Sequence, residues 1–497
     1  MQTVQWPSLL LATTVLLSSS SSNLVDGFSS CSPSKRRRPT LNHHHPAIPL
    51  YSISNDKERS SEISSFKNDT VAVLERSADD STETEATAVP LSPLLSSEDE
   101  EEPSSSLSQL YRRQRAAQIS HSFETRPYRP AWWAQSSHIQ TIFGVLSRSK
   151  AMYTDQENVL LKGVSRLDDF EWDHRQRVTT PDNDFFDVDW KYSTLSSSSS
   201  HADDAGDSVK PIVLICHGLQ SSSSSPLAKD MANAFNSNGM DAAVVNFRGC
   251  SGELNALSFG YHLSFTDDLD FYIRTQIQPK YPKRPIYFSG FSLGANVVTK
   301  YLQQLGDEAY ELNIQGAAVN AVPFNLMKVW QNLSRPGVAK TLYGDRLCQS
   351  LVDSSRQGLE NGIELPFTAE DLDKCETIID MENLVVCSLF DFDDAFDYYR
   401  KSSTIRDLDK ISVPQLVINA LDDPFFVGNE NPDEHEPSLP FRVQFTERGG
   451  HCGYILHERL DGEKEEDALP LSGWLPTQLS RFLSHVEEQR RICDNQE

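Results

Sequence analysis

Short apolar runs recur along the chain and are separated by stretches with helical spacing. The apolar runs cover residues 212–216, 242–247, 286–289, 316–321, 415–420 and 441–445. The helical stretches between them cover residues 227–236, 267–276 and 295–305. Strands that alternate with helices form a mostly parallel sheet with helices on both of its faces. The pattern therefore predicts an α/β fold.

Three further segments complete this pattern. Residues 177–190 alternate in polarity and predict strands around a turn at Pro181-Asp182-Asn183. Residues 471–492 predict an amphipathic helix whose apolar face packs on the core. That face holds Leu475, Leu479, Phe482, Leu483 and Val486. Between residues 323 and 406 the alternation stops in an acidic, aromatic-rich stretch, where we expect a helical cap insertion over the catalytic end of the sheet.

Composition separates an N-terminal leader from the rest of the chain. Residues 1–105 are rich in Ser, Thr, Pro and Glu and include an acidic block at 98–102. Such sequence buries too little apolar area to offset the entropy of ordering it, so we expect a disordered leader. The remaining residues, 106–497, suffice for one large α/β domain, with its folded part beginning near Phe123.

An apolar segment near the start of the leader suggests targeting. Residues 8–17 are apolar, but a membrane-spanning helix needs about 20 such residues. The segment resembles the apolar region of a signal peptide, although no Lys or Arg precedes it. We expect entry into the secretory route. Plastid delivery through a two-part presequence, and retention as a membrane anchor, both stay open.

Charge and cysteine usage narrow the function classes. The formal net charge of −26 opposes nonspecific nucleic-acid binding, so no nucleic-acid partner is expected. The eight cysteines contain no C-x-x-C pair, and neither disulfides nor a metal site is predicted. Asn332-Leu333-Ser334 matches the N-glycosylation pattern, which matters only if the chain enters the secretory route.

The strongest chemical motif is Gly290-Phe291-Ser292-Leu293-Gly294. It follows an apolar run and precedes a helical stretch, which is the context in which G-x-S-x-G forms a nucleophile elbow. We expect this turn to hold Ser292 in a strained conformation, with its Oγ exposed at the carboxyl end of the sheet. A plain Gly/Ser turn is the alternative.

A serine hydroxyl is a weak nucleophile and needs a base, which an acid must orient. In this fold the acid and then the histidine follow the serine along the chain. Asp422 and Asp423 follow one strand run, and His451 lies among glycines after the last. We prefer Asp423 as the acid, because related hydrolases place it third after the small residue that ends the strand, here Ala420. We expect Asp422 to cap the turn, and a mobile, close loop to carry His451 to Ser292.

An oxyanion hole completes such a site. His217-Gly218-Leu219 follows the strand at 212–216, where this fold places its oxyanion loop. We expect the backbone N–H groups of Leu219 and Leu293 to bind the developing negative charge. For His217 we expect a structural role, in which its side chain holds the loop by hydrogen bonding.

Together these motifs resemble the YheT-like branch of α/β-hydrolases, which also contains membrane-associated esterases and phospholipase-type enzymes. The matching stretches are residues 130–133, 138–141, 184–190, 217–219, 246–252, 290–296, 397–399, 402–403, 419–425 and 449–451. The resemblance implies an α/β-hydrolase fold and a serine hydrolase without metal or organic cofactor. It implies action on carboxylic esters, often lipid-like, through Ser292, Asp423 and His451.

The chain departs from the family pattern in two motifs and in the acidic loop at residues 430–440. Gln220-Ser221 replaces the Glu-Gly that usually follows His-Gly-Leu, and Leu263-Ser264-Phe265-Thr266 stands where Ser-Gly-Glu-Thr is common. Loss of an acidic side chain there could alter substrate fit or loop anchoring.

Two other readings of the site stay open. One is a noncatalytic scaffold of the same fold that binds a ligand. The other is a thioester or amide hydrolase that uses the same triad. We expect a small ester or lipid as the substrate, while peripheral or anchored membrane association and the oligomeric state stay open.

Overall fold

The central sheet follows the predicted alternation of strands and helices. We describe a computed structural model over residues 105–148, 170–195, 209–257, 260–426, 431–432, 436–457 and 472–494, all within one unit, Glu101–Glu497. The predicted targeting segment at residues 8–17 and the leader before Ser105 lie outside the described residues. Within the described part, no helix has both the length and the apolarity to cross a membrane.

Eight strands form the sheet in the order β1-β2-β4-β3-β5-β6-β7-β8. They are β1 (His174–Thr179), β2 (Phe185–Lys191), β3 (Ile212–Cys216), β4 (Asp241–Asn246), β5 (Ile286–Phe291), β6 (Ile314–Asn320), β7 (Gln415–Ala420) and β8 (Phe441–Thr446). Strands β3 to β8 run parallel to one another, whereas β2 is antiparallel to both β1 and β4. Every residue of β3, β4, β5 and β7 is buried, which explains why these strands appear in the sequence as continuous apolar runs.

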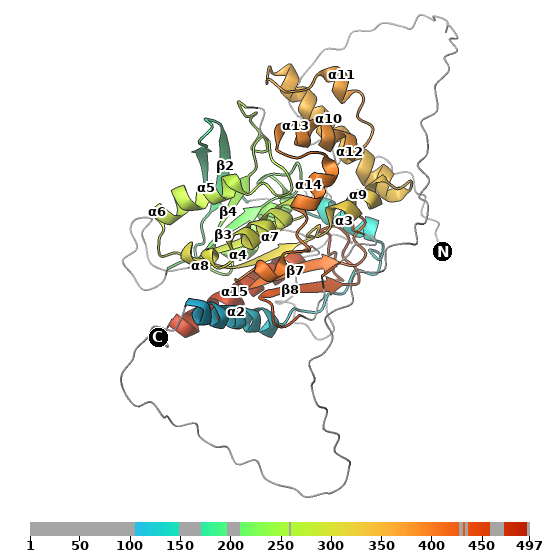
Figure 1. Cartoon of the computed structure of the whole chain (residues 1–497). Coiled ribbons are helices and arrows are strands. Elements are labelled where there is room, and N and C mark those ends of the chain that lie inside the picture. Colours follow the sequence, from blue (N-terminus) through green and yellow to red (C-terminus); the bar gives the residue numbers. More distant parts are fainter. Residues whose placement is uncertain are drawn as a thin grey trace, which may run out of the picture. The chain divides into compact units, whose positions relative to one another are not determined.

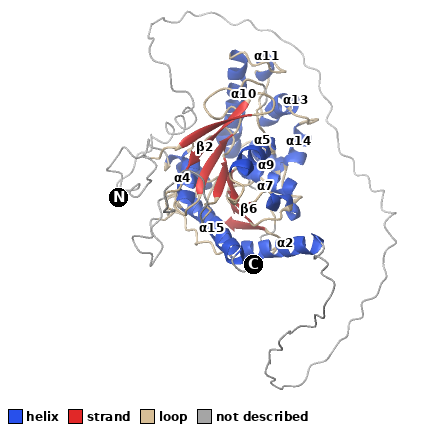
Figure 2. Ribbon diagram, turned by 90° about the vertical axis from the view of Figure 1, so that its left-hand side faces the viewer, coloured by secondary structure: helices blue, strands red, loops and turns tan. Residues whose placement is uncertain are grey.

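Helices cover both faces of the sheet (Figure 2). One face carries α4 (Pro226–Asn236) and α15 (Trp474–Asp494), which share a core with Val213, Ile215 and Val244. The other carries α5 (Asp267–Tyr272), a π-helical turn at Ile273–Ile277 and α7 (Leu293–Leu305). The other short helices before β6 are α3 (Ser137–Leu146), α6 (Gln278–Lys280) and α8 (Glu308–Glu311). The predicted α/β-hydrolase fold is confirmed.

Helix α15 packs on the core as its amphipathic pattern predicts. Leu475, Leu479, Phe482 and Leu483 are fully buried. The helix lies beside α2 (Ser105–Ser122) in Figure 1, and Phe482 contacts Phe123 edge to face at 5.3 Å between ring centroids.

The described fold begins earlier than the expected start near Phe123. Helix α2 lacks a strong apolar face, because only small side chains, Ala116 and Ala117, are buried among its hydrophobic residues. Ser120 and His121 near its end bond to the carbonyls of Pro440 and Leu439, just before β8. Alanines give a weak periodic signal, so hydrophobic spacing alone did not identify this helix.

Between β6 and β7 the described chain is helical, in the stretch where the sequence suggested an insertion (Figure 1). It contains α9 (Leu326–Ser334), α10 (Asp345–Glu360), α11 (Ala369–Leu372), α12 (Ile378–Met381), α13 (Cys387–Leu389) and α14 (Ala395–Ser402), with π-helical turns at Lys340–Gly344 and Glu382–Val386. Side-chain caps start four of these helices: Asn325, Thr368, Thr377 and Asp394. We call this stretch the helical insertion. Its outer part has a small core of its own.

Removing a large core side chain from α15 tests how much this helix stabilises the domain. We expect Phe482→Ala to lower the free energy of unfolding by about 3–5 kcal/mol, because it leaves a cavity where Phe482 was fully buried. Ile492→Ala on the same helix removes a side chain that is 44% exposed and should change stability by less than about 0.5 kcal/mol. Urea unfolding of both variants measures the difference, and equal losses would contradict this account.

Candidate active site

The turn between β5 and α7 holds Ser292 in an unusual backbone conformation. Its φ of 56° and ψ of −122° lie where non-glycine residues are strained. Gly294 makes the turn fit, because a Cβ there would lie 2.1 Å from the Cys216 carbonyl oxygen. A Cβ on Gly290 would lie 3.0 Å from the same oxygen. The expected nucleophile elbow is thus present in geometry.

The three side chains expected to form the triad meet at this turn. The Ser292 Oγ lies 3.0 Å from His451 Nε2, and His451 Nδ1 lies 2.8 Å from Asp423 Oδ2. A carboxylate only accepts hydrogen bonds, so in the neutral imidazole Nδ1–H donates to Asp423 and Nε2 accepts from the serine. Asp423 is almost completely buried, with a side chain that is 1% exposed.

Two aromatic rings position the imidazole, and the sequence did not single them out. The Phe425 ring stacks on His451 at 4.1 Å with an interplanar angle of 24°. Phe426 meets the same ring edge on at 5.4 Å. Both residues directly follow the acid and Pro424 along the chain. That adjacency was the available signal, but only the fold shows that these rings turn toward the histidine.

The loop that carries His451 is closely packed against α3. A Cβ on Gly450 would lie 2.5 Å from the Ser137 carbonyl oxygen, and one on Gly453 would lie 2.1 Å from that of Gln140. The His451 N–H donates to Thr141 Oγ1 at 2.9 Å. The glycines therefore permit close approach between backbones.

Asp422 and Arg148 hold this loop from two sides. The Gly450 N–H donates to Asp422 Oδ1 at 2.9 Å, so this aspartate anchors the histidine loop, where the sequence suggested only a turn cap. Burial raises the pKa of Asp422. The Arg148 guanidinium is buried and donates to the carbonyls of Cys452 and Gly453. The role of Arg148 could not be predicted from the sequence, because no motif marks a residue that bonds to backbone carbonyls.

The expected oxyanion loop lies against the serine turn. A Cβ on Gly218 would lie 3.4 Å from the Ser292 Cβ, which brings the next residue, Leu219, near the nucleophile. Leu293 is the first residue of α7, where a backbone N–H has no carbonyl partner within the helix. His217 has the structural role expected for it: Nδ1–H donates to the Gly218 carbonyl at 2.8 Å and Nε2 accepts from the Phe247 N–H at 3.1 Å. Burial lowers the pKa of His217 to about 4, so the ring is neutral at physiological pH.

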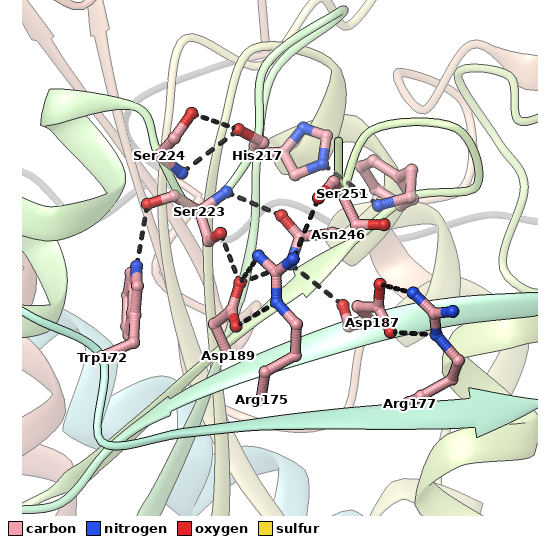
Figure 3. Close-up of polar contacts among 12 residues, drawn as sticks. Trp172, Arg175, Arg177, Asp187, Asp189, His217, Ser223, Ser224, Asn246 and Ser251 are labelled. Atoms are coloured by element: carbon pink, nitrogen blue, oxygen red, sulfur yellow. Dashed lines mark hydrogen bonds and ion pairs between the residues drawn. The ribbon is translucent and has the colours of Figure 1, made fainter. Parts of the chain in front are cut away.

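A buried polar network fixes the far end of this loop to the sheet (Figure 3). Asp189 on β2 accepts from Ser223 Oγ at 2.5 Å and from Asn246 Nδ2 at 3.0 Å. Asn246 Oδ1 accepts from the Ser223 N–H at 2.7 Å, and Arg175 bonds both oxygens of Asp189 at 2.8 Å. Burial alone would raise the pKa of Asp189, but the bonds from Arg175 and Ser223 hold it below its usual value.

The helical insertion contacts the loop of the acid and helix α3, against which the loop of the base packs. Asn332 Nδ2 donates to the Pro424 carbonyl at 2.6 Å, so the amide of the predicted glycosylation motif is engaged beside Asp423. The Tyr343 hydroxyl lies 3.0 Å from His138 Nδ1 on α3. The Tyr343 ring packs on Phe425 at 4.9 Å between centroids.

The described residues offer no group of three or more His, Cys, Asp or Glu side chains arranged to bind a metal ion. Their seven cysteines are free.

A serine paired with a histidine, which is in turn paired with a buried carboxylate, is the arrangement used for nucleophilic acyl transfer.

Fold and site together define an α/β-hydrolase, and comparison with known proteins assigns the family. The family model Hydrolase_4, described as "Serine aminopeptidase, S33", matches residues 207–428. A protein of Escherichia coli named "Putative esterase YheT" is 30% identical over 310 residues, which cover 61% of this chain and 85% of that protein. The chain belongs to the YheT-like family of α/β-hydrolases.

Two more distant relatives are a lipase and a phospholipase by name. The monoacylglycerol lipase of Saccharomyces cerevisiae is 27% identical, over 50% of this chain and 56% of that protein. The phospholipase ABHD3 of Bos taurus is 25% identical, over 67% of this chain and 74% of that protein. Relatives of this chain are thus esterases and lipases, which supports ester hydrolysis in general.

The strain at Ser292 is measurable in variants that lack the hydroxyl. A residue in such a conformation costs about 1–3 kcal/mol, which glycine avoids at an entropic cost of about 0.5–1 kcal/mol. We therefore expect Ser292→Gly to be more stable than Ser292→Ala by about 1 kcal/mol. Urea unfolding compares the two variants, and a less stable glycine variant would show that the turn is not strained.

Proposed function

We propose that this protein is a serine esterase that cleaves carboxylic esters of lipid-like character through an acyl-enzyme. The observation that carries the proposal is the continuous hydrogen-bonded chain from Asp423 through His451 to Ser292, with contacts of 2.8 and 3.0 Å. The serine Oγ is already within hydrogen-bond reach of its base, so no rearrangement of the loop is required.

The reaction follows from this geometry. Ser292 Oγ attacks the acyl carbon while His451 Nε2 takes its proton. Asp423 holds the imidazole in the required tautomer and stabilises the imidazolium. His451 then gives the proton to the leaving alcohol. Water, activated by the same histidine, releases the acid and restores Ser292.

The tetrahedral intermediates carry negative charge on the former carbonyl oxygen. In this proposal the N–H groups of Leu219 and Leu293 bind that oxygen, and each such donor is worth about 2.7–4 kcal/mol of barrier height. The proposal is supported by the closeness of Gly218 to the Ser292 side chain and by the position of Leu293 at the start of α7.

Lipid-like substrates are favoured by the relatives and by the insertion. The yeast relative is named a monoacylglycerol lipase and the bovine relative a phospholipase. Tyr343 of the insertion packs on Phe425, which stacks on His451. This aromatic surface beside the base suits contact with an apolar acyl group. We propose that the helical insertion shapes acyl-chain selectivity.

A covalent probe separates catalysis from a noncatalytic scaffold. A fluorophosphonate should label the wild-type protein, because it phosphonylates an activated serine, and it should not label Ser292→Ala. Labelling is read by intact-protein mass spectrometry. An unlabelled wild type would favour the scaffold, and labelling that persists in Ser292→Ala would move the nucleophile elsewhere.

The two neighbouring aspartates provide a matched pair for the acid role. Asp423→Asn should lower kcat by on the order of 10⁴-fold, because it favours the wrong tautomer of the histidine. Asp422→Asn keeps an oxygen that can accept from the Gly450 N–H, so its loss should be less than about tenfold. Initial rates on acyl esters of graded chain length measure both variants, and a larger loss in Asp422→Asn would reverse the assignment. Thioester and amide analogues of the preferred acyl group then identify the bond cleaved.

A further inference from the structure

Gln220 occupies a special position beside the expected oxyanion donor. It directly follows Leu219, and its φ of 52° is a left-handed value for a non-glycine residue. Its backbone N–H donates to the Tyr261 hydroxyl at 2.8 Å. The backbone conformation at Gln220 therefore fixes which way this side chain leaves the loop.

The side chain of Gln220 leaves the loop toward helix α10 of the insertion. Its Nε2 donates to the Ser350 carbonyl at 3.0 Å and contacts Ser354 Oγ at 2.9 Å. Its Oε1 accepts from Ser350 Oγ. A glutamine amide offers two N–H donors and one carbonyl acceptor, and here all three functions are used on one helix that lies 130 or more residues further along the chain.

The two ends of the oxyanion loop are held in different ways. Ser223 is bonded to Asp189 and Asn246 in the buried network at the sheet. The contact between Gln220 and Ser354 lies at the surface, and the two contacts of Gln220 with Ser350 are partly buried. The inner end is thus held by the buried network, while the outer end is held by Tyr261 and by the contacts of the Gln220 side chain with α10.

The same stretch of the insertion also packs on an aromatic ring that contacts the base. The π-helical turn Lys340–Gly344 runs directly into α10, and its Tyr343 packs on Phe425, which stacks on His451. Residues 340–360 therefore make two contacts with the site. Ser350 bonds to Gln220 of the oxyanion loop, and Tyr343 packs on the Phe425 ring that stacks on His451.

We propose that Gln220 is a positioning residue that latches helix α10 to the oxyanion loop, so that the placement of the insertion sets the position of the Leu219 N–H relative to Ser292. This inference rests on the proposed function. An acyl group that binds beneath the insertion then improves the alignment of the donor in the transition state, which raises kcat rather than only lowering KM.

Gln220→Asn is the most informative variant. Asparagine tolerates a left-handed backbone but is one methylene too short to reach α10. We expect kcat on acyl esters to fall about tenfold with KM changed less than about twofold, since a displaced donor costs less than the 10²–10³-fold of a lost one. The matched control is Gln349→Ala on α10, whose amide bonds only at the surface, to Asp353, and which should keep wild-type kcat.

Ser354→Ala tests the latch from the helix side, because it removes one partner of the Gln220 amide. Its effect on kcat should have the same direction as that of Gln220→Asn, and the two effects should not add in the double variant. A kcat loss in Gln220→Asn no larger than that of Gln349→Ala would overturn the proposal, and so would fully additive effects.

Hydrogen–deuterium exchange of the full-length protein gives a readout that does not need activity. Gln220→Asn should increase exchange both in residues 218–222 and in α10, because each is released from the other. An increase confined to α10, or none, would overturn the coupling. A wild type that neither hydrolyses esters nor reacts with a fluorophosphonate would overturn the proposed function, and the exchange data would still decide whether the latch exists.

Discussion

The site depends first on one strained turn. Ser292 has a backbone conformation that non-glycine residues avoid, and the sheet must supply the space that makes it tenable. That space exists because Gly290 and Gly294 allow β5 and α7 to approach the end of β3. The same approach brings the segment after β3, with Gly218, against the serine. One packing constraint therefore positions both the proposed nucleophile and the proposed oxyanion loop.

The other loops are positioned by buried polar groups rather than by apolar packing alone. Arg148, Asp422 and Thr141 hold the backbone around His451, and the network around Asp189 holds the end of the oxyanion loop. Such groups are costly to bury unless each finds a partner, so they fix one arrangement of the loops. The helical insertion adds contacts from outside the sheet, because Asn332 and Tyr343 contact the residues that follow Asp423. Its helix α10 also bonds to the Gln220 side chain.

Much of this could be predicted from the sequence, for physical reasons. Buried parallel strands are continuous apolar runs, so β3 to β8 were identified within a few residues, and the G-x-S-x-G pattern located the elbow. Helix α2 was missed because its buried hydrophobic side chains are alanines, which give only a weak periodic signal. Phe425 and Arg148 were missed because their roles depend on which loop the fold brings against them. Gln220 was recognised as a departure from the family pattern, but its partner helix is specified only by the fold.

The central claim is that Ser292 becomes acylated during turnover. The most direct measurement is rapid mixing of the protein with a chromogenic ester, followed by acid quench and peptide mass spectrometry. The account predicts a burst of alcohol of about one equivalent per chain when deacylation is slow, with the acyl mass on the peptide that contains Ser292. Ester hydrolysis without any adduct under those conditions, or with the adduct on another residue, would contradict it.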